Sequence, residues 1–515
     1  MARSQSTTKK VLLFTIGMIL TKLSSFLLNI ALSYKYGATY YSDSIIIAMN
    51  IPIILFSGII MAIALCFVPM YKEEVVLEKG DTNYLTSLYI NIFTILLLFI
   101  CVIIFIFPRE TIAIFANGLP EAGIVLASTI TRYVALACIF NLATGIFQGY
   151  LQANNKFTLV SISALPVNII IALSIFLSNT KNVTLYVGVG LLCSYYFQFI
   201  LFFLASRHSG YRYIPAFNIK DKRVRQLLVM ILPVILGTLL YDVNSIIDKN
   251  FASFLSQGSI SVLDYSYKVA GAAQGILAYP VTTVIYTQLA DHSSKNDVDG
   301  LNVSIEQGFL RLSLIMIPVL SGMLCTSDLL IKLIFGRGEF SSESIKTTSI
   351  CLILYLVGMY AISYRALFEK AFYSLKKTRI TLINTTITVA TNIFFDWLLY
   401  KKYQCYGLAM ATSISLIISC IFLVVQLKHT TFLSLSKETK KSLIKIVVSS
   451  ICMTVLIFGL RYIMILFQFK INEILELLIF VIAGIAFYFF MLFFLKESTF
   501  RIVTHEILNR RNKRV

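Results

Sequence analysis

Apolar runs long enough to cross a bilayer as helices recur along the whole chain, with short polar segments between them. Crossing ~30 Å of hydrocarbon takes ~20 apolar residues, and the backbone groups must be satisfied within the helix. The apolar–polar alternation typical of membrane strands is absent, so a β-barrel is not expected. The pattern predicts about fourteen spanning helices, at residues 11–34, 44–70, 84–107, 124–151, 157–177, 184–206, 226–252, 262–289, 307–325, 344–372, 379–400, 406–428, 441–465 and 474–496.

An internal repeat organises these spans. The segment 150–159 resembles 373–382 at an offset of 223 residues, and residues 36–43 are echoed by 256–264. Six predicted spans separate the copies, so the two lobes run in the same direction, an arrangement that supports alternating access in transporters. We therefore expect an all-α integral membrane protein with two parallel six-helix lobes plus two C-terminal helices. The predicted parts are an N-terminal lobe at 1–206, a basic cytoplasmic linker at 207–225, a C-terminal lobe at 226–428, and two further helices with a basic cytoplasmic tail at 429–515.

Composition supports a membrane location and explains the charge. Hydrophobic residues make up 58% of the chain and charged residues 13%, while the net charge is +19. In a soluble protein that charge would favour nucleic acid as a partner, but in a membrane protein Lys and Arg mark the cytoplasmic loops. The basic residues gather in the loops 207–226 and 429–445 and in the tail 510–514, all on one predicted side. This pattern predicts a multi-pass protein with both termini cytoplasmic and no nucleic-acid partner.

Enzyme motifs are absent from the sequence. It contains no CxxC pair and no Walker, GxSxG or HExxH pattern, and its four histidines fall in predicted loops or in the tail. Most of the nine cysteines lie within apolar runs, where they are expected to pack as small apolar side chains. The sequence therefore predicts a transporter rather than an enzyme, with no cofactor or metal beyond a candidate sodium ion.

Several ionisable residues interrupt the predicted spans, where each costs ~2.5–3.5 kcal/mol to insert. Lys22 lies within the first span, and two i,i+4 pairs follow in later spans, Asp264 with Lys268 and Arg365 with Glu369. Cations that outnumber nearby anions in a membrane favour an anionic ligand that carries phosphate. For Lys249, Arg311 and Lys370 the alternative is that the side chain reaches toward the headgroups.

Asn392 and Asp396 form a further i,i+4 pair, and Thr412 lies on the next predicted span. Carboxylate, amide and hydroxyl oxygens suit a hard cation such as sodium. A polar contact between helices explains the same residues equally well, so both interpretations stay open.

Five segments together resemble the MurJ/MviN family, the lipid II flippases of a superfamily that also includes drug and oligosaccharide exporters. They are LIKLIFGRGEFSSESI (330–345), LFEKAFYSLKKTRITL (367–382), IIDKNFASFLSQGSISVLDYSYKV (246–269), YGATYYSDSIIIAMNIP (36–52) and FVPMY (67–71). The resemblance extends over nearly the whole chain. It implies a bacterial inner-membrane flippase for undecaprenyl-pyrophosphate-linked peptidoglycan precursor, lipid II, driven by membrane potential or sodium. Such a protein acts in peptidoglycan and cell-wall biogenesis and so in cell shape.

The resemblance also assigns roles to individual residues. Lys22 and Lys268 match arginines of the family's central cationic cavity, and Asp43 matches an acidic residue after the first periplasmic turn. With Arg365 and Glu369 these are the predicted substrate-binding residues. Asp248, Asn392, Asp396 and Thr412 fall where some members bind sodium, and the last two helices are thought to line a groove for the lipid tail. Expected partners are the lipid-linked substrate, membrane lipids and cell-wall synthesis enzymes.

The sequence departs from the family pattern at cavity positions. Leu28 replaces a second arginine of the first span, the arginine expected shortly after Pro52 is missing, and Gly271 replaces an acidic residue. Both retained cations are lysines, which bind phosphate as point charges rather than as forks. A cavity with fewer cationic side chains than the family pattern is also compatible with another function. The protein could export a different lipid-linked oligosaccharide, such as a capsule or O-antigen unit. A drug or amphiphile exporter and a non-transporting scaffold for wall enzymes are further alternatives.

Overall fold

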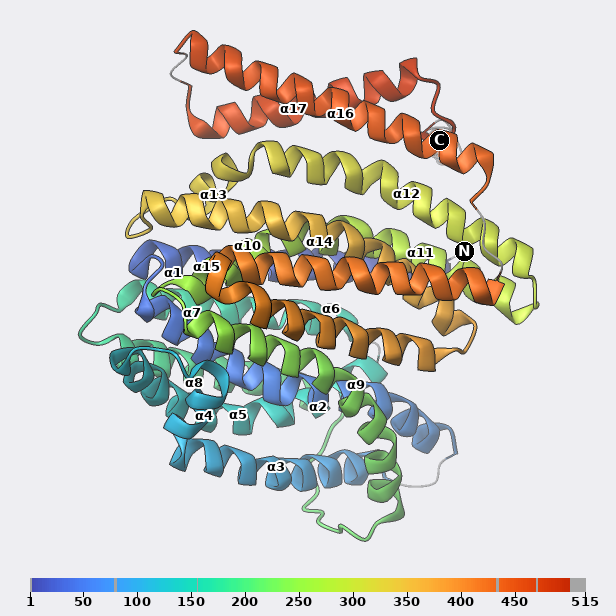
Figure 1. Ribbon diagram of the computed structural model, residues 1–515. Helices are drawn as coiled ribbons and strands as arrows, with labels where there is room; N and C mark the ends of the chain where they lie inside the picture. The colour runs from blue at the N-terminus through green and yellow to red at the C-terminus, as the bar shows by residue number, and fades with distance from the viewer. Residues whose placement is uncertain (1, 78–80, 155, 432–434, 469–470, 501–515) are drawn as a thin grey trace. The chain divides into compact units, whose positions relative to one another are not determined.

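The computed structural model describes residues 2–77, 81–154, 156–431, 435–468 and 471–500, and within these ranges every regular element is a helix (Figure 1). The elements are α1 (Ala2–Tyr36), α2 (Tyr40–Leu77), α3 (Thr82–Ile106), α4 (Pro108–Ala116), α5 (Glu121–Ala153), α6 (Phe157–Ile162), α7 (Ala164–Leu177), α8 (Val183–His208), α9 (Lys222–Ser253), α10 (Ser259–Ala273), η1 (Gln274–Ala278), α11 (Tyr279–Ser294), α12 (Val298–Cys325), α13 (Ser327–Phe335), α14 (Ser342–Ser374), α15 (Thr378–Thr431), α16 (Lys437–Leu466) and α17 (Glu473–Phe494).

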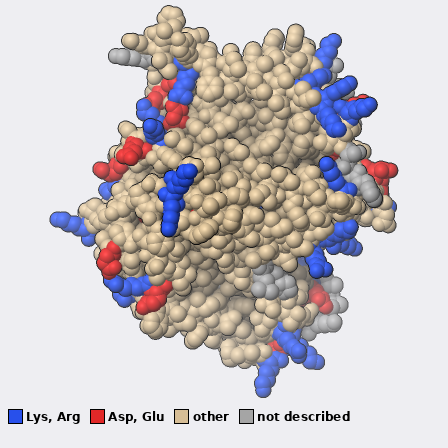
Figure 2. Space-filling model, in the orientation of Figure 1, with Lys and Arg blue, Asp and Glu red and all other residues tan. Residues whose placement is uncertain are grey.

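Twelve helices in the described part of the chain are long and apolar enough to cross a membrane. One of them, α15, is interrupted at Gln404 (φ 51°, ψ −132°) and holds the two predicted spans 379–400 and 406–428. The predicted span 226–252 lies within α9, which has 32 residues. On the face drawn in Figure 2 the charged side chains lie mostly toward helix ends and leave the middles uncharged. The predicted all-α membrane fold is confirmed.

Two predicted spans are broken helices, and proline explains both breaks. The span 157–177 consists of α6 and α7, which meet at Ser163. Pro166 cannot donate a backbone hydrogen bond to Ile162, and its ring crowds that carbonyl. The span 262–289 passes from α10 through the π-turn η1 into α11, where Pro280 occupies the first turn. Helices α4 and α13 were not predicted from the sequence, because they have nine residues each and are too short to cross the bilayer.

The chain forms two compact units. The first comprises the residues up to Ser261 together with Gly338–Ser341, and the second comprises Val262–Arg337 and the residues from Ser342 onward. Helix α9 therefore packs in the first unit, where it contacts α2. Gly58 permits this contact, because a Cβ at that position would lie 2.3 Å from the Thr238 hydroxyl. The lobe boundaries drawn from the sequence repeat stay a prediction, and the tail at 510–514 lies outside the described residues.

The basic segment after α8 is docked on the first unit. Tyr211 is 1% exposed, and its hydroxyl lies 2.9 Å from Ser87 Oγ on α3. Asn91 Nδ2 donates to the Ala216 carbonyl at 2.8 Å. The Arg223 side chain donates to Asp221 at 2.8 Å, and this hydrogen bond lowers the pKa of the Asp221 carboxyl. The segment predicted as a linker is thus held by specific contacts on a membrane helix.

Candidate functional site

Lys22 is an exposed cation on α1 in the first unit. The neighbouring polar side chains hold α1 in place: Thr21 Oγ1 donates to the Ser161 carbonyl at 2.8 Å, and Asn168 Nδ2 donates to Ser24 Oγ at 2.9 Å. Lys22 itself has no ion-pair partner among the residues that the structure describes. A lysine within a span normally faces a water-filled space rather than lipid. Contact between the exposed ammonium group and an anionic ligand stays a prediction.

Asp43 is enclosed rather than open to a ligand. The residue is 2% exposed, and its carboxylate accepts from the backbone N–H groups of Gly258 at 2.7 Å and Ser261 at 2.8 Å, and from the Ser261 hydroxyl. It thereby caps the N-terminus of α10. Gly258 has φ +88°, and a Cβ there would lie 2.2 Å from the Ala38 carbonyl oxygen. The contacts favour a positioning role for Asp43, and direct substrate binding stays a prediction.

Lys268 lies on α10 in the second unit and has a counterion. Its ammonium lies 2.5 Å from Asp264 Oδ2, one helical turn away, and the two side chains are 38% and 14% exposed. The pairing weakens the expectation that cations within the spans lack nearby anions. The lysine remains partly exposed, so an anion can still reach it.

Arg365 is buried within the second unit, with a side chain only 3% exposed. Its Nε donates to Glu369 Oε1 at 2.7 Å. Its terminal nitrogens reach the hydroxyls of Thr388 at 3.3 Å and Thr385 at 3.4 Å. The guanidinium thus connects α14 to α15. This geometry indicates a structural pair that positions two helices, and the predicted substrate contact of Arg365 and Glu369 is untested.

The candidate cation ligands Asn392 and Asp396 are deeply buried in α15, at 1% and 0% exposure. Asn392 Nδ2 donates to Asp396 Oδ2 at 3.1 Å. A carboxylate buried this far requires a cation, a proton or further hydrogen bonds to offset its desolvation. Thr412 follows the break at Gln404 and donates to the Leu408 carbonyl at 3.1 Å.

Asp248, the fourth candidate ligand, lies on α9 in the first unit and accepts from Asn244 Nδ2 at 3.3 Å. The structure therefore brings together Asn392 and Asp396 within one helix. The membership of Asp248 and Thr412 in one sodium site stays a prediction.

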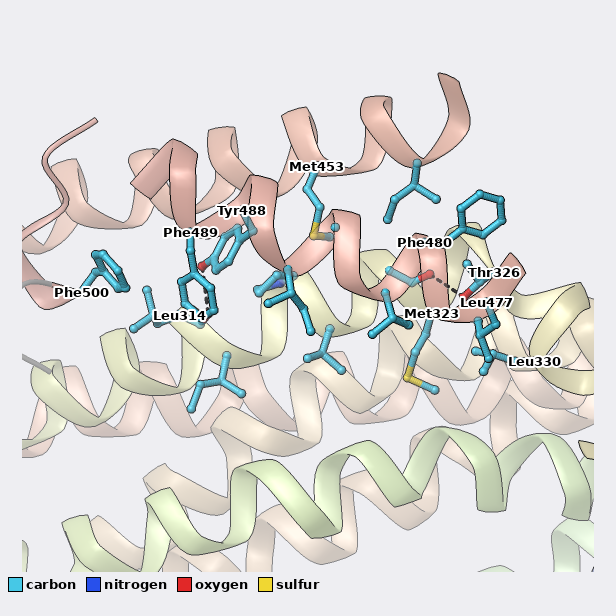
Figure 3. Close-up of a pocket in the computed structure, with 18 of the residues that line it drawn as sticks. Leu314, Met323, Thr326, Leu330, Met453, Leu477, Phe480, Tyr488, Phe489 and Phe500 are labelled. Atoms are coloured by element: carbon cyan, nitrogen blue, oxygen red, sulfur yellow. Dashed lines mark hydrogen bonds between the residues drawn. The ribbon is translucent and has the colours of Figure 1, made fainter. Parts of the chain in front are cut away.

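A cavity of about 710 Å³ lies in the second unit between α12 and the C-terminal pair α16 and α17 (Figure 3). Its wall is largely aliphatic and aromatic, with Leu314, Met323, Met453, Phe480 and Phe489 among the lining residues. Arg311 and Thr326 are polar exceptions. Such a surface suits a long hydrocarbon chain rather than a polar solute.

Polar contacts connect the helices that form this cavity, which we call the groove beside α12. Tyr488 Oη donates to the Leu314 carbonyl at 2.9 Å, the bond drawn beside Phe489 in Figure 3. At one end Arg461 on α16 donates to Asp328 on α13 at 3.0 Å. At the other end the Glu306 carboxylate accepts from the Ser436 N–H, at 2.8 Å, at the start of α16.

Sequence reasoning did not single out the residues that brace the groove. Arg461 offered one signal, since it is the only Lys or Arg between 446 and 469. Gly322 is a further groove residue, and a Cβ placed there would meet no heavy atom within 4 Å. Its importance depends on open space beside it, which no local pattern reveals.

Comparisons with known protein sequences all point to one family. The sequence model of the family described as lipid II flippase MurJ matches residues 32–480. A probable lipid II flippase MurJ of Thermotoga maritima is 24% identical over 427 residues, covering 82% of this chain and 86% of the relative. The lipid II flippase MurJ of Thermosipho africanus is 26% identical over 440 residues, covering 85% and 89%.

Solved structures add a fold comparison. A structure of lipid II flippase MurJ in an inward closed conformation superposes with a TM-score of 0.79 at 25% identity, covering 93% of this chain and 98% of that one. An inward-facing multidrug transporter of the MATE family gives a TM-score of 0.63 at 13% identity, covering 82% and 98%. The second likeness concerns the fold alone.

Proposed function

The chain belongs to the lipid II flippase MurJ family, and we propose that it moves lipid II from the inner to the outer leaflet of the bacterial cytoplasmic membrane. It is a membrane transporter and not an enzyme, with a lipid-linked substrate. The observation that carries the proposal is the family match over residues 32–480, and the apolar groove beside α12 fits the substrate's long hydrocarbon tail. Peptidoglycan synthesis would depend on this step.

Each part of the substrate has a matching surface on the chain. The isoprenoid tail would lie in the groove lined by Leu314, Met453 and Phe480. The candidate contacts for the pyrophosphate are the exposed ammonium group of Lys22 and the partly exposed one of Lys268. Alternating access would expose these groups first to the cytoplasm and then to the outside. One charge moved through 100 mV supplies ~2.3 kcal/mol, enough to bias such a cycle more than tenfold.

The phosphate role is tested by complementation of a flippase-depleted bacterium. Lys22→Ala and Lys268→Ala should each abolish growth, because each removes a point charge that a neutral side chain cannot replace. Lys22→Arg and Lys268→Arg are the matched controls and should retain growth, since they keep the charge. Full growth of both alanine variants would refute the phosphate site.

Sodium is proposed as a coupling ion at Asp396, supported by the burial of this carboxylate beside Asn392. Asp396→Asn keeps the size of the side chain and removes its charge. Transport by that variant should no longer respond to sodium, whereas transport by Asp248→Asn reports whether the other unit contributes a ligand. A sodium response that persists in Asp396→Asn argues against the site.

Export of another lipid-linked oligosaccharide is not favoured by the family match. Lipid II headgroup accessibility at the outer surface of depleted cells separates the two functions directly. Depletion should lower it several-fold, and an unchanged value would favour the alternative substrate.

Topology and partners are further proposals. Basic loops on one side support cytoplasmic termini, which an impermeant thiol reagent tests through single cysteines introduced near each end. Cell-wall synthesis enzymes are expected partners, and in-cell crosslinking from the cytoplasmic loops tests that expectation.

A further inference from the structure

A second cavity lies entirely within the first unit, apart from the groove beside α12. It has a volume of about 690 Å³ and is bounded by α3, α5, α8 and the segment 211–217. Ligand cavities commonly measure about 300–1,000 Å³, so its size suits one amphiphile chain. Because α3, α5 and α8 are all membrane-spanning candidates, the molecules that can reach this cavity are mainly lipids.

Aromatic rings form the apolar wall of this cavity. Phe203 on α8 lies 5.9 Å from Phe147 on α5 and 6.0 Å from Phe199, measured between ring centroids. Tyr213 and Phe217 lie in the segment 211–217, which is docked on α3, and they line one side of the cavity. Their side chains are 54% and 56% exposed. Rings that are half exposed beside a membrane helix are typical of the bilayer interface.

Polar groups are present at the same cavity. Tyr213 Oη donates to Asn91 Oδ1 at 3.1 Å, which fixes the position of the phenol at the rim. The Thr94 hydroxyl oxygen lines the cavity, is shielded from solvent, and has no hydrogen-bond partner among the described residues. A buried hydroxyl without a partner is costly. A ligand with an ester carbonyl or hydroxyl would satisfy it.

Positive charge borders the rim. The Arg207 guanidinium lies 5.9 Å from the centroid of the Phe203 ring, which itself lines the cavity. Arg212 adjoins Tyr213 and is exposed. The segment 206–225 contains six Lys or Arg and one Asp. Arg223 is neutralised by Glu74 and Asp221 at 2.8 Å each, whereas Arg207 and Arg212 have no ion-pair partner in the part of the chain that the structure describes.

We propose that this cavity binds an anionic phospholipid. An acyl chain lies against Phe147, Phe199 and Phe203, and the phosphate lies between Arg207 and Arg212. The charge around the rim selects an anionic headgroup over a zwitterionic one, since basic pockets between membrane helices on the cytoplasmic side recognise such headgroups. The bound lipid would also pack against the exposed rings of Tyr213 and Phe217, steadying the docked segment.

The test measures lipid retention by the purified full-length protein in detergent, using native mass spectrometry. Dioleoyl phosphatidylglycerol and dioleoyl phosphatidylcholine are titrated separately, because they share acyl chains and differ in headgroup charge. We expect one phosphatidylglycerol to be retained at about tenfold lower concentration than phosphatidylcholine. Arg207→Gln combined with Arg212→Gln should remove this preference.

Matched variants separate a defined site from general surface charge. Lys222→Gln with Arg225→Gln removes the same two charges from exposed positions on the first turn of α9, and should leave the preference unchanged. Thr94→Phe fills the cavity and should abolish retention of both lipids, while the arginine pair keeps the test informative if that variant does not fold. Equal loss in both charge pairs, or equal retention of the two lipids by the natural protein, would overturn the proposal. The readout is independent of lipid II transport.

Discussion

The two repeats place helices in corresponding positions but differ sharply in polarity. At the offset of 223 residues, four polar residues of the second repeat correspond to apolar residues of the first: Arg365 to Leu142, Glu369 to Ile146, Asn392 to Ile169 and Asp396 to Leu173. Ile169 and Leu173 are 40% and 55% exposed, whereas Asn392 and Asp396 are at most 1% exposed. A helix face directed at lipid must stay apolar, so only the covered face of α15 can carry a carboxylate.

The third helix of each repeat shows a related difference. Helix α3 borders the aromatic cavity and is partly covered by the basic segment 209–221, while α12 borders the apolar groove and is covered by α16 and α17. A charged loop beside one helix favours a headgroup. A hairpin that presents a largely apolar wall to the groove favours a hydrocarbon tail beside the other. We therefore expect the elements added to each repeat to decide which part of a lipid that repeat can bind.

The largest expected loss of stability comes from replacing Arg365 with leucine, the residue found at the corresponding position of the first repeat. Arg365→Leu leaves the Glu369 carboxylate and two threonine hydroxyls without their buried partner, which should cost ~3–5 kcal/mol. Thermal unfolding of the purified protein in detergent measures this loss of stability. The double variant Arg365→Leu, Glu369→Ile restores the apolar pair of the first repeat and should recover most of the loss. A single variant as stable as the natural protein would show that the pair is not structural.

The reverse exchange tests the lipid-facing side of the first repeat. Leu173→Asp places a carboxylate on an exposed face of α7 and should cost up to ~3.5 kcal/mol on insertion. The yield of membrane-inserted protein reports this cost. Asp396→Leu is the matched control and should insert normally, because a leucine carries no desolvation cost. Equal yields for natural protein and Leu173→Asp would mean that this face is not directed at lipid.

A smaller effect is expected from filling the groove beside α12. Gly322→Phe places a ring where a Cβ meets no heavy atom within 4 Å. Lipid II translocation in reconstituted vesicles should fall about tenfold, equivalent to ~1.4 kcal/mol, while the unfolding temperature stays unchanged. Gly459→Phe, at an equally open position on α16 that does not line the groove, should have no effect. Undiminished transport by Gly322→Phe would exclude the groove from tail binding.

The last comparison concerns the echoed acidic residues Asp43 and Asp264, and it includes the smallest expected effect. Asp43→Ala removes a buried cap from α10 and should cost ~1–2 kcal/mol. Asp264→Ala breaks a partly exposed ion pair with Lys268 and should cost at most ~1 kcal/mol. Thermal unfolding of the two purified variants would measure both losses of stability. A larger loss at Asp264 than at Asp43 would reverse the roles that the two contacts indicate.

Much of the architecture was predictable because hydrocarbon imposes a rule on every residue of a span. Apolar length predicted the helices, and the cost of charge singled out Lys22, Lys268 and Asp396 within them. The parallel order of the two lobes stays a prediction from the repeat. The short helices α4 and α13 were not predicted, because nine residues cannot span a bilayer and hydropathy therefore gives no signal for them. The break at Ser163 shows that Pro166 acts locally even within an apolar run.

The contacts of these residues depended on tertiary structure. No sequence pattern indicates that Asp43 caps α10 across 215 residues, or that Arg365 lies against threonines of α15. The groove and the aromatic cavity arise where helices distant in sequence leave space between them. Hydropathy is a property of each segment and determines that it enters the membrane. Which polar groups are paired, and which surfaces stay open to a lipid, is decided only when the segments pack together.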